Sequence, residues 1–161
     1  MSTEEVRGYL ILRIEEASGR TKKDEFVWDT NVESEFQAFI KVDLRGGSRN
    51  VKAQTKRAPL IGETVTWRED VVLEVLEGAN ELRFLFCRDR YHGGKRGTSV
   101  IAACGIFVDD IIEAVPIDKY FELFKPNLLG GGGFIRICMN FVKDLSELQQ
   151  PPRWWPLLRL P

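Results

Sequence analysis

Residues 80–108 read NELRFLFCRDRYHGGKRGTSVIAACGIFV. At the start of this stretch, Leu82, Phe84 and Phe86 occupy every second position, a period that is typical of a β-strand with one buried face. Apolar residues dominate again over 99–108, which predicts a second strand. We expect the two strands to pair, with residues 88–98 forming the loop between them.

The expected loop is basic. It holds four Lys or Arg residues, one Asp and the only His of the chain. Positive charge gathered at one end of a fold attracts anions, although a solvated polar loop has the same composition. The sequence therefore predicts a site for an anion, made by Arg88, Arg90, His92, Lys95 and Arg96.

The rest of the chain repeats the strand pattern between turn signals. Six more short apolar or alternating runs cover 8–14, 37–44, 49–56, 67–75, 120–124 and 134–142. This predicts an all-β fold, an eight-stranded antiparallel β-sandwich, over residues 1–143. Residues 144–161 are expected to be a Pro/Trp-rich tail or linker. Its Trp154 and Trp155 either dock a partner or membrane, or lie along the sandwich.

Composition limits the partners. A chain of 161 residues is long enough for one domain with its own core. Its net charge of −1 gives no general attraction to nucleic acid. Three Cys residues form no CxxC pair, and no apolar run approaches ~18 residues. We expect buried thiols and a cytoplasmic protein that reaches membranes only peripherally.

A short apolar island interrupts the long polar segment 15–36. Phe26-Val27-Trp28 lies there between acidic residues. Because Tyr and Trp favour the membrane–water interface, we predict that Phe26 and Trp28, together with Tyr91, contact a membrane. The alternative is that Trp28 folds back onto the sandwich.

The side chains that catalysis would need are scarce. One His and no Cys pair argue against a zinc site, and the glycine runs lack the Lys-Ser/Thr of a phosphate-binding P-loop. Asp109-Asp110 could suggest a pair of acid–base carboxylates, but capping of a short helical turn by Asp109 is the simpler explanation. We predict a binding module without catalytic residues, metal or cofactor, serving a longer signalling protein such as a protein kinase.

Five stretches, in this order and spacing, resemble the C2 domain, the membrane-targeting β-sandwich of protein kinases C and synaptotagmins. The resemblance covers residues 6–143 and is carried by Gly8-x-Leu10-x-Leu12-x-Ile14-x-x-Ala17, Gln37-Ala38-Phe39-Ile40-Lys41-Val42, Thr55-Lys56 with Trp67-Arg68-Glu69, Leu82-x-Phe84-x-Phe86, and Gly133-x-Ile135-x-Ile137-x-Met139-x-Phe141. The first and last stretches look like the circularly permuted order, the type II topology, of the novel, calcium-independent protein kinases C.

The calcium ligands of that family are replaced here. Members that bind calcium use Asp carboxylates from two loops, and the ion needs several hard, mostly anionic oxygen ligands. The corresponding positions hold Gln37, Arg88, Arg90 and Ser99. Two arginines there would repel the ion, so the resemblance implies a calcium-independent domain and disfavours calcium-dependent phospholipid binding.

The resemblance also implies a function, which is to target the host protein to anionic phospholipid membranes. The family's phosphoinositide site uses alternating lysines on one strand, where this chain has Lys52 and Gln54. We therefore expect a secondary basic strand of Lys52, Lys56 and Arg57. The alternative is a protein-interaction module, because some novel protein kinases C bind phosphotyrosine through a His with basic neighbours, and His92 has such neighbours here.

Overall fold

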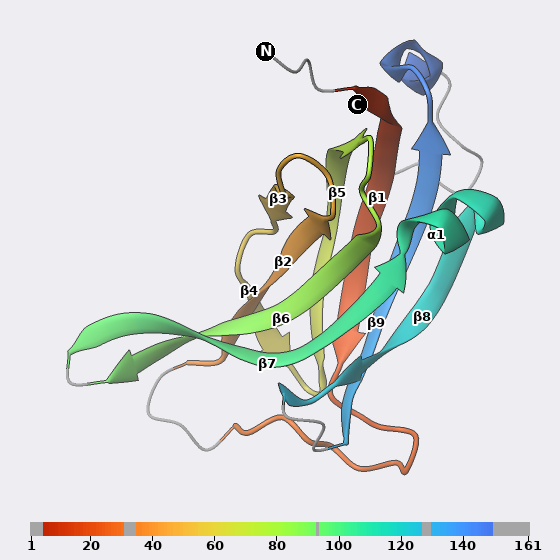
Figure 1. Ribbon diagram of the computed structural model, residues 1–161. Coiled ribbons are helices and arrows are strands. Elements are labelled where there is room, and N and C mark those ends of the chain that lie inside the picture. Colours follow the sequence, from red (N-terminus) through yellow and green to blue (C-terminus); the bar gives the residue numbers. More distant parts are fainter. Residues whose placement is uncertain (1–4, 31–34, 93, 127–129, 150–161) are drawn as a thin grey trace.

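The computed structural model describes residues 5–30, 35–92, 94–126 and 130–149, whose arrangement Figure 1 shows. These residues form nine strands, the helix α1 and the 3-10 helix η2. In chain order the elements are β1 (Val6–Ser18), β2 (Gln37–Arg45), β3 (Val51–Gln54), β4 (Ala58–Ile61), β5 (Thr64–Leu76), β6 (Glu81–His92), β7 (Lys95–Phe107), α1 (Val108–Ala114), β8 (Ile117–Phe124), β9 (Gly131–Val142) and η2 (Leu145–Gln149).

The strands form an antiparallel sheet folded into two layers. One layer has the order β5–β1–β9–β8, and the other has the order β3–β2–β6–β7. On one side β4 joins the layers, because it pairs with both β2 and β5. On the other side a bridge between Ala103 and Phe124 joins β7 to β8. The predicted all-β antiparallel sandwich is confirmed. The structure has a ninth strand because residues 58–61 pair as β4, and the strand expected at 49–56 is limited to β3.

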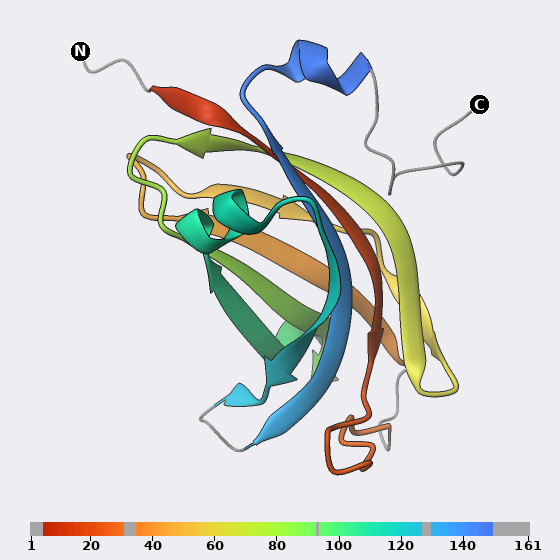
Figure 2. The same cartoon turned by 90° about the vertical axis from the view of Figure 1, so that its right-hand side faces the viewer.

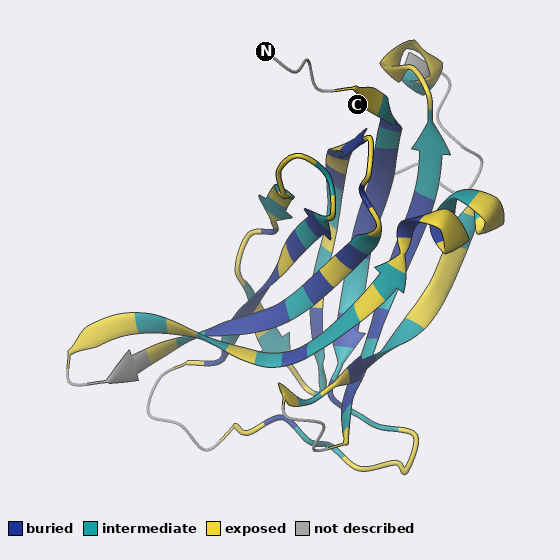
Figure 3. Ribbon diagram, in the orientation of Figure 1, coloured by how far each residue is buried: buried dark blue, intermediate teal, exposed yellow. Residues whose placement is uncertain are grey.

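The core lies between the two layers. Leu82, Phe84 and Phe86 are fully buried in it, as the period of two predicts. From the opposite layer come Leu12 and Met139, which are directly opposite each other in the β1–β9 ladder. Figure 3 shows buried residues concentrated along the middle of the strands and exposed residues on the segment that β6 and β7 extend away from the sandwich.

The expected loop 88–98 is instead mostly a β-ladder, which corrects the sequence-based prediction. β6 continues to His92 and β7 begins at Lys95, so that Asp89 is paired with Thr98 and the two strands reverse within two residues. Gly94 has a φ of 78°, the left-handed conformation that such tight hairpin turns need. Figure 1 shows the result, which we call the β6–β7 hairpin (residues 88–99), projecting away from the sandwich.

Helix α1 buries Val108 and Ile111 against the core. Its N-cap residue is Phe107, and no side chain caps it, so the predicted capping by Asp109 is wrong. Asp109 lies in the first turn, where a carboxylate still favours the helix dipole, and its Oδ1 is 3.9 Å from Nη1 of Arg7. Among the described residues, no helix has the length and apolarity that crossing a bilayer requires.

Candidate functional site

The β6–β7 hairpin presents two exposed cations. Arg90 of β6 and Lys95 of β7 are both exposed, and neither makes an ion pair with another described residue. Tyr91 and His92 belong to the same strand, but their side chains lie outside the described residues. The hairpin therefore keeps only part of the basic cluster that the sequence predicts.

Arg88 has a different position from the one expected. It is only 7% exposed, on the face of β6 that continues the core. Its Nη1 donates a hydrogen bond to the carbonyl oxygen of Asp29 at 2.9 Å, and its guanidinium carbon lies 4.2 Å from the ring centroid of Phe36. Burial lowers the pKa of Arg88. This corrects the expectation that Arg88 faces solvent, since it anchors the hairpin base to the segment between β1 and β2.

Arg96 and Arg57 are both engaged by one carboxylate. Nε and Nη2 of Arg57 donate to Oδ2 and Oδ1 of Asp89 at 2.6 and 3.0 Å, and Nη2 of Arg96 donates to Oδ2 at 3.0 Å. The hydrogen bond from Arg57 and that from Arg96 hold the pKa of Asp89 below its usual range. The guanidinium of Arg57 also covers the ring of Phe39, 4.5 Å from its centroid. Sequence reasoning counted both arginines as available to an anion and missed their partner.

The ion pair between Arg57 and Asp89 separates Arg57 from the other two residues of the predicted secondary basic strand, Lys52 and Lys56. Lys52 is exposed on β3, and Lys56 is exposed just after that strand. Lys41 is exposed on the neighbouring strand β2, directly opposite Gln54. Arg57 turns toward the hairpin, because Asp89 binds it. The lateral face therefore keeps Lys52 and Lys56 from the predicted set and adds Lys41.

Trp28 lies in the core, which corrects the prediction of a membrane contact. Its ring stacks on that of Phe86 with centroids 4.3 Å apart, and its Nε1 donates to the carbonyl oxygen of Gly132 at 2.8 Å. Phe26 is partly buried and meets Trp28 edge to face at 5.9 Å. The alternative in which Trp28 folds back onto the sandwich is the one that the structure shows.

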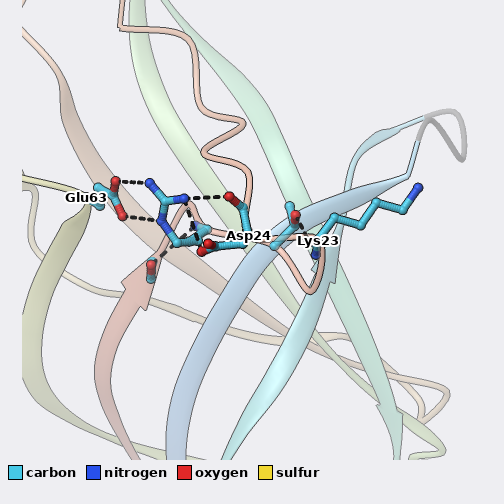
Figure 4. A network of polar contacts seen from close by, with 6 residues as sticks. Lys23, Asp24 and Glu63 are labelled. Atoms are coloured by element: carbon cyan, nitrogen blue, oxygen red, sulfur yellow. Dashed lines mark hydrogen bonds and ion pairs between the residues drawn. The ribbon is translucent and has the colours of Figure 1, made fainter.

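The segment after β1 is fastened by Arg20. The Arg20 guanidinium bonds Glu63 through two nitrogens, and its Nη1 donates to the carbonyl oxygen of Asp24 at 2.6 Å (Figure 4). The hydrogen bonds from Arg20 to Glu63 lower the pKa of Glu63. Figure 4 shows the Lys23 side chain pointing away from this network, and Lys23 is exposed.

Ile61 is an apolar side chain that sequence reasoning missed. It ends β4 and is 75% exposed, next to Gly62, whose φ is 63°. Figures 1 and 2 both place the turn from β4 to β5 at the same end of the sandwich as the segment that follows β1. An apolar residue directly before a turn glycine was the available signal, because the last residue of a short strand has few neighbours to cover it.

The positions aligned with calcium ligands come together at the base of the hairpin. Arg88 is paired across β2 with Ala38, the neighbour of Gln37, and across β7 with Ser99. The nearby carboxylate of Asp89 is bound by two arginines. Within the described ranges, no three His, Cys, Asp or Glu side chains are grouped as metal ligands would be.

Comparison with known proteins identifies the fold. The sequence matches no protein-family model and no curated protein. The C2 domain-containing protein of an elicitor-responsive gene matches with a TM-score of 0.62 and 15% identity, over 89% of this chain and 95% of that one. The first C2 domain, domain A, of plant extended synaptotagmin 1 matches with a TM-score of 0.60 and 14% identity, over 87% and 98% of the two chains. The tandem C2 domains A and B of extended synaptotagmin 2 match with a TM-score of 0.62 and 16% identity, over 92% and 48%.

The protein therefore has the fold of a C2 domain. At these identities the likeness concerns the fold, so the ligand must be argued from the side chains of this chain.

Proposed function

We propose that this C2-fold domain targets its host protein to anionic phospholipid membranes without calcium, and that the β6–β7 hairpin is the main contact. The observation that carries the proposal is the pair Arg90 and Lys95, which are exposed on a projecting hairpin without an ion-pair partner among the described residues. A cation whose charge is not neutralised locally keeps its full attraction for an external anion.

Two cations alone give weak binding. Each basic group near an anionic leaflet contributes ~1 kcal/mol, so Arg90 and Lys95 together supply about 2 kcal/mol. Ile61 supports a second contact, because full burial of such a side chain in an apolar medium is worth about 2 kcal/mol. Recruitment from the cytoplasm would then be peripheral, reversible and sensitive to salt.

Calcium independence is supported by the base of the hairpin. A site for the ion needs several free anionic oxygens. Here Arg88 stands at one expected ligand position, and the carboxylate of Asp89 already binds Arg57 and Arg96.

The strand order supports the more specific part of the resemblance. β1 lies between β5 and the last strand, β9, and this supports the circularly permuted order of the C2 domains of the novel protein kinases C.

The test is sedimentation with vesicles of phosphatidylcholine, with and without phosphatidylserine, in chelator. R90Q/K95Q should weaken binding to the anionic vesicles about 30-fold, the equivalent of the 2 kcal/mol above. The matched control is K52Q/K56Q, which removes the same charge from the lateral face and should bind as the unmodified protein does. Added salt should weaken the unmodified protein.

The opposite result assigns the site elsewhere. If K52Q/K56Q loses the vesicles and R90Q/K95Q keeps them, the lateral strand face is the site and the hairpin proposal is wrong. If the hairpin variant keeps vesicle binding but loses binding to a phosphotyrosine peptide, the domain is the protein-interaction module considered above.

A further inference from the structure

Strand β8 lies at an edge of its layer. It pairs with β9 along its length, but its other side has one described pairing, the bridge between Ala103 and Phe124. The predicted tail, with Trp154 and Trp155, lies outside the described residues. Residues 118–120 are exposed, and Figure 3 shows the exposed part of β8 next to α1. Backbone N–H and C=O groups along such an edge can pair with another extended chain.

Tyr120 presents its hydroxyl on the outer face of this edge strand. The residue is 57% exposed, and its hydroxyl donates a long hydrogen bond of 3.4 Å to Oε1 of Glu16. Arg136 of β9 is directly opposite Tyr120 on one side and Glu16 on the other. Because directly opposite residues share a face of the sheet, the three side chains form one row across β8, β9 and β1.

Arg136 is the cation of this row. Its Nε and Nη2 donate to Oδ1 and Oδ2 of Asp118 at 3.0 and 2.9 Å, and its Nη1 lies 4.0 Å from Oε1 of Glu16. The hydrogen bonds from Arg136 lower the pKa of Asp118. A guanidinium binds a phosphate through the same pair of parallel hydrogen bonds that it makes with a carboxylate. A phosphate on Tyr120 would therefore compete with Asp118 for Arg136.

We propose that Tyr120 is a phosphorylation site for a protein-tyrosine kinase, and that the phosphate formed there takes Arg136 from Asp118. In the transfer, the phenolic oxygen of Tyr120 forms a bond to the γ-phosphorus of ATP, and the bond from that phosphorus to the β,γ-bridging oxygen breaks. ADP leaves, and the phenolic proton passes to the catalytic Asp of the kinase. The row gains about −1.5 to −2 elementary charges at pH 7.

The edge position distinguishes Tyr120 from Tyr9. β1 is paired on both sides, with Tyr9 directly opposite Glu74 and Val142, so an enzyme cannot add its own chain beside Tyr9 without opening a ladder. Tyr9 is also only half-exposed. The side chain of the third tyrosine, Tyr91, lies outside the described residues. Between the two described tyrosines, Tyr120 is the one that a kinase can reach in the folded domain.

Phosphorylation of the folded domain tests the site. The probe is a purified tyrosine kinase catalytic domain with ATP and Mg²⁺, and poly(Glu,Tyr) is the positive-control substrate. Site mapping by mass spectrometry should find Tyr120 modified at least tenfold faster than Tyr9. An unmodified Tyr120 under conditions that phosphorylate poly(Glu,Tyr) overturns the proposal. Modification of Tyr9 as fast as Tyr120 also overturns it, because the kinase would then be acting on the unfolded chain.

Titration of the phosphate by phosphorus NMR tests the contact with Arg136. The second pKa of the phosphate, about 6 when unperturbed, should be higher by about 1 in Arg136→Gln than in the unmodified sequence, because the nearby cation is lost. Asp118→Asn removes the competing carboxylate and should lower this pKa, which covers the case in which Arg136→Gln fails to fold. If neither substitution shifts the pKa, the phosphate does not bind Arg136 and this part of the proposal is wrong.

Discussion

The guanidinium of Arg88 lies over the ring of Phe36, 4.2 Å from its centroid. The two residues are far apart in the sequence, and the contact joins the base of the β6–β7 hairpin to the start of β2. A hydrogen bond from Arg88 to the backbone of Asp29 adds a second link to the segment before β2. A basic residue that looks like part of an anion site is therefore a structural anchor.

Arg88→Ala should lower the free energy of unfolding by about 3 kcal/mol, because a buried charged hydrogen bond and a cation–π contact are lost together. Urea denaturation measures the change. The control is Arg90→Ala two residues further on, which is exposed and should change stability by less than about 0.5 kcal/mol. Equal effects of the two substitutions would show that Arg88 does not act as an anchor.

Trp28 should contribute to stability in two separable ways. Trp28→Ala should cost about 4 kcal/mol, since it removes a large buried ring. Trp28→Phe keeps an aromatic ring but removes the hydrogen bond to Gly132, and should cost about 1–2 kcal/mol. Thermal and urea unfolding measure both. A Trp28→Ala protein with normal stability and lost vesicle binding would instead place Trp28 at the membrane.

Asp89→Asn should have a pH-dependent effect. The pKa of Asp89 is lowered in the folded state, so its contribution to stability is fully present above the unfolded pKa of ~3.9 and is lost as pH falls through the folded pKa. The unmodified protein should therefore be more stable than Asp89→Asn at neutral pH, and the difference should vanish in acid. Unfolding curves across this range decide the point.

The same substitution should also change vesicle binding. Asp89→Asn removes the negative charge that binds Arg96 and Arg57 beside the hairpin, so affinity for anionic vesicles should rise severalfold. Asp118→Asn is the matched control. It removes the negative charge that binds Arg136 at 2.9 and 3.0 Å in the other layer, and affinity should stay the same. A fall in affinity with Asp89→Asn would mean that the hairpin must be held in place by Asp89 to bind.

Calcium should not bind. Titration calorimetry up to millimolar calcium should show no saturable heat, and the melting temperature should not rise, because Gln37, Arg88, Arg90 and Ser99 supply no carboxylate. A saturable signal from the unmodified protein would refute this prediction. If Arg90→Gln left that signal intact, residues other than these four would have to be the calcium ligands.

Ile61→Ser should lower affinity for anionic vesicles about 30-fold without changing stability, because the side chain is exposed and loses only its burial in the membrane, worth about 2 kcal/mol. Phe107→Ser is the control, at an exposed position beside α1, and should bind normally. Unchanged binding by Ile61→Ser would leave the hairpin cations as the supported contact.

Local sequence determined the strands and the class of fold. The alternation of Leu82, Phe84 and Phe86 required one buried face, and the same pattern in the other strands left an antiparallel sandwich as the arrangement that buries them all. The position of the basic cluster at one end of that sandwich also followed from the sequence, since it lies between two strands that pair.

Tertiary structure decided which of the basic residues are available. Asp29 and Phe36, which hold Arg88, and Arg57, which binds Asp89, all come from segments distant in the sequence. The number of charged residues in a segment does not reveal such partners, because the energy of an ion pair depends on the distance between the two side chains in the folded protein. The position of Trp28 has the same cause, because its packing partner, Phe86, is distant in the sequence. An apolar side chain on a long irregular segment packs against whichever apolar residues the fold brings near it.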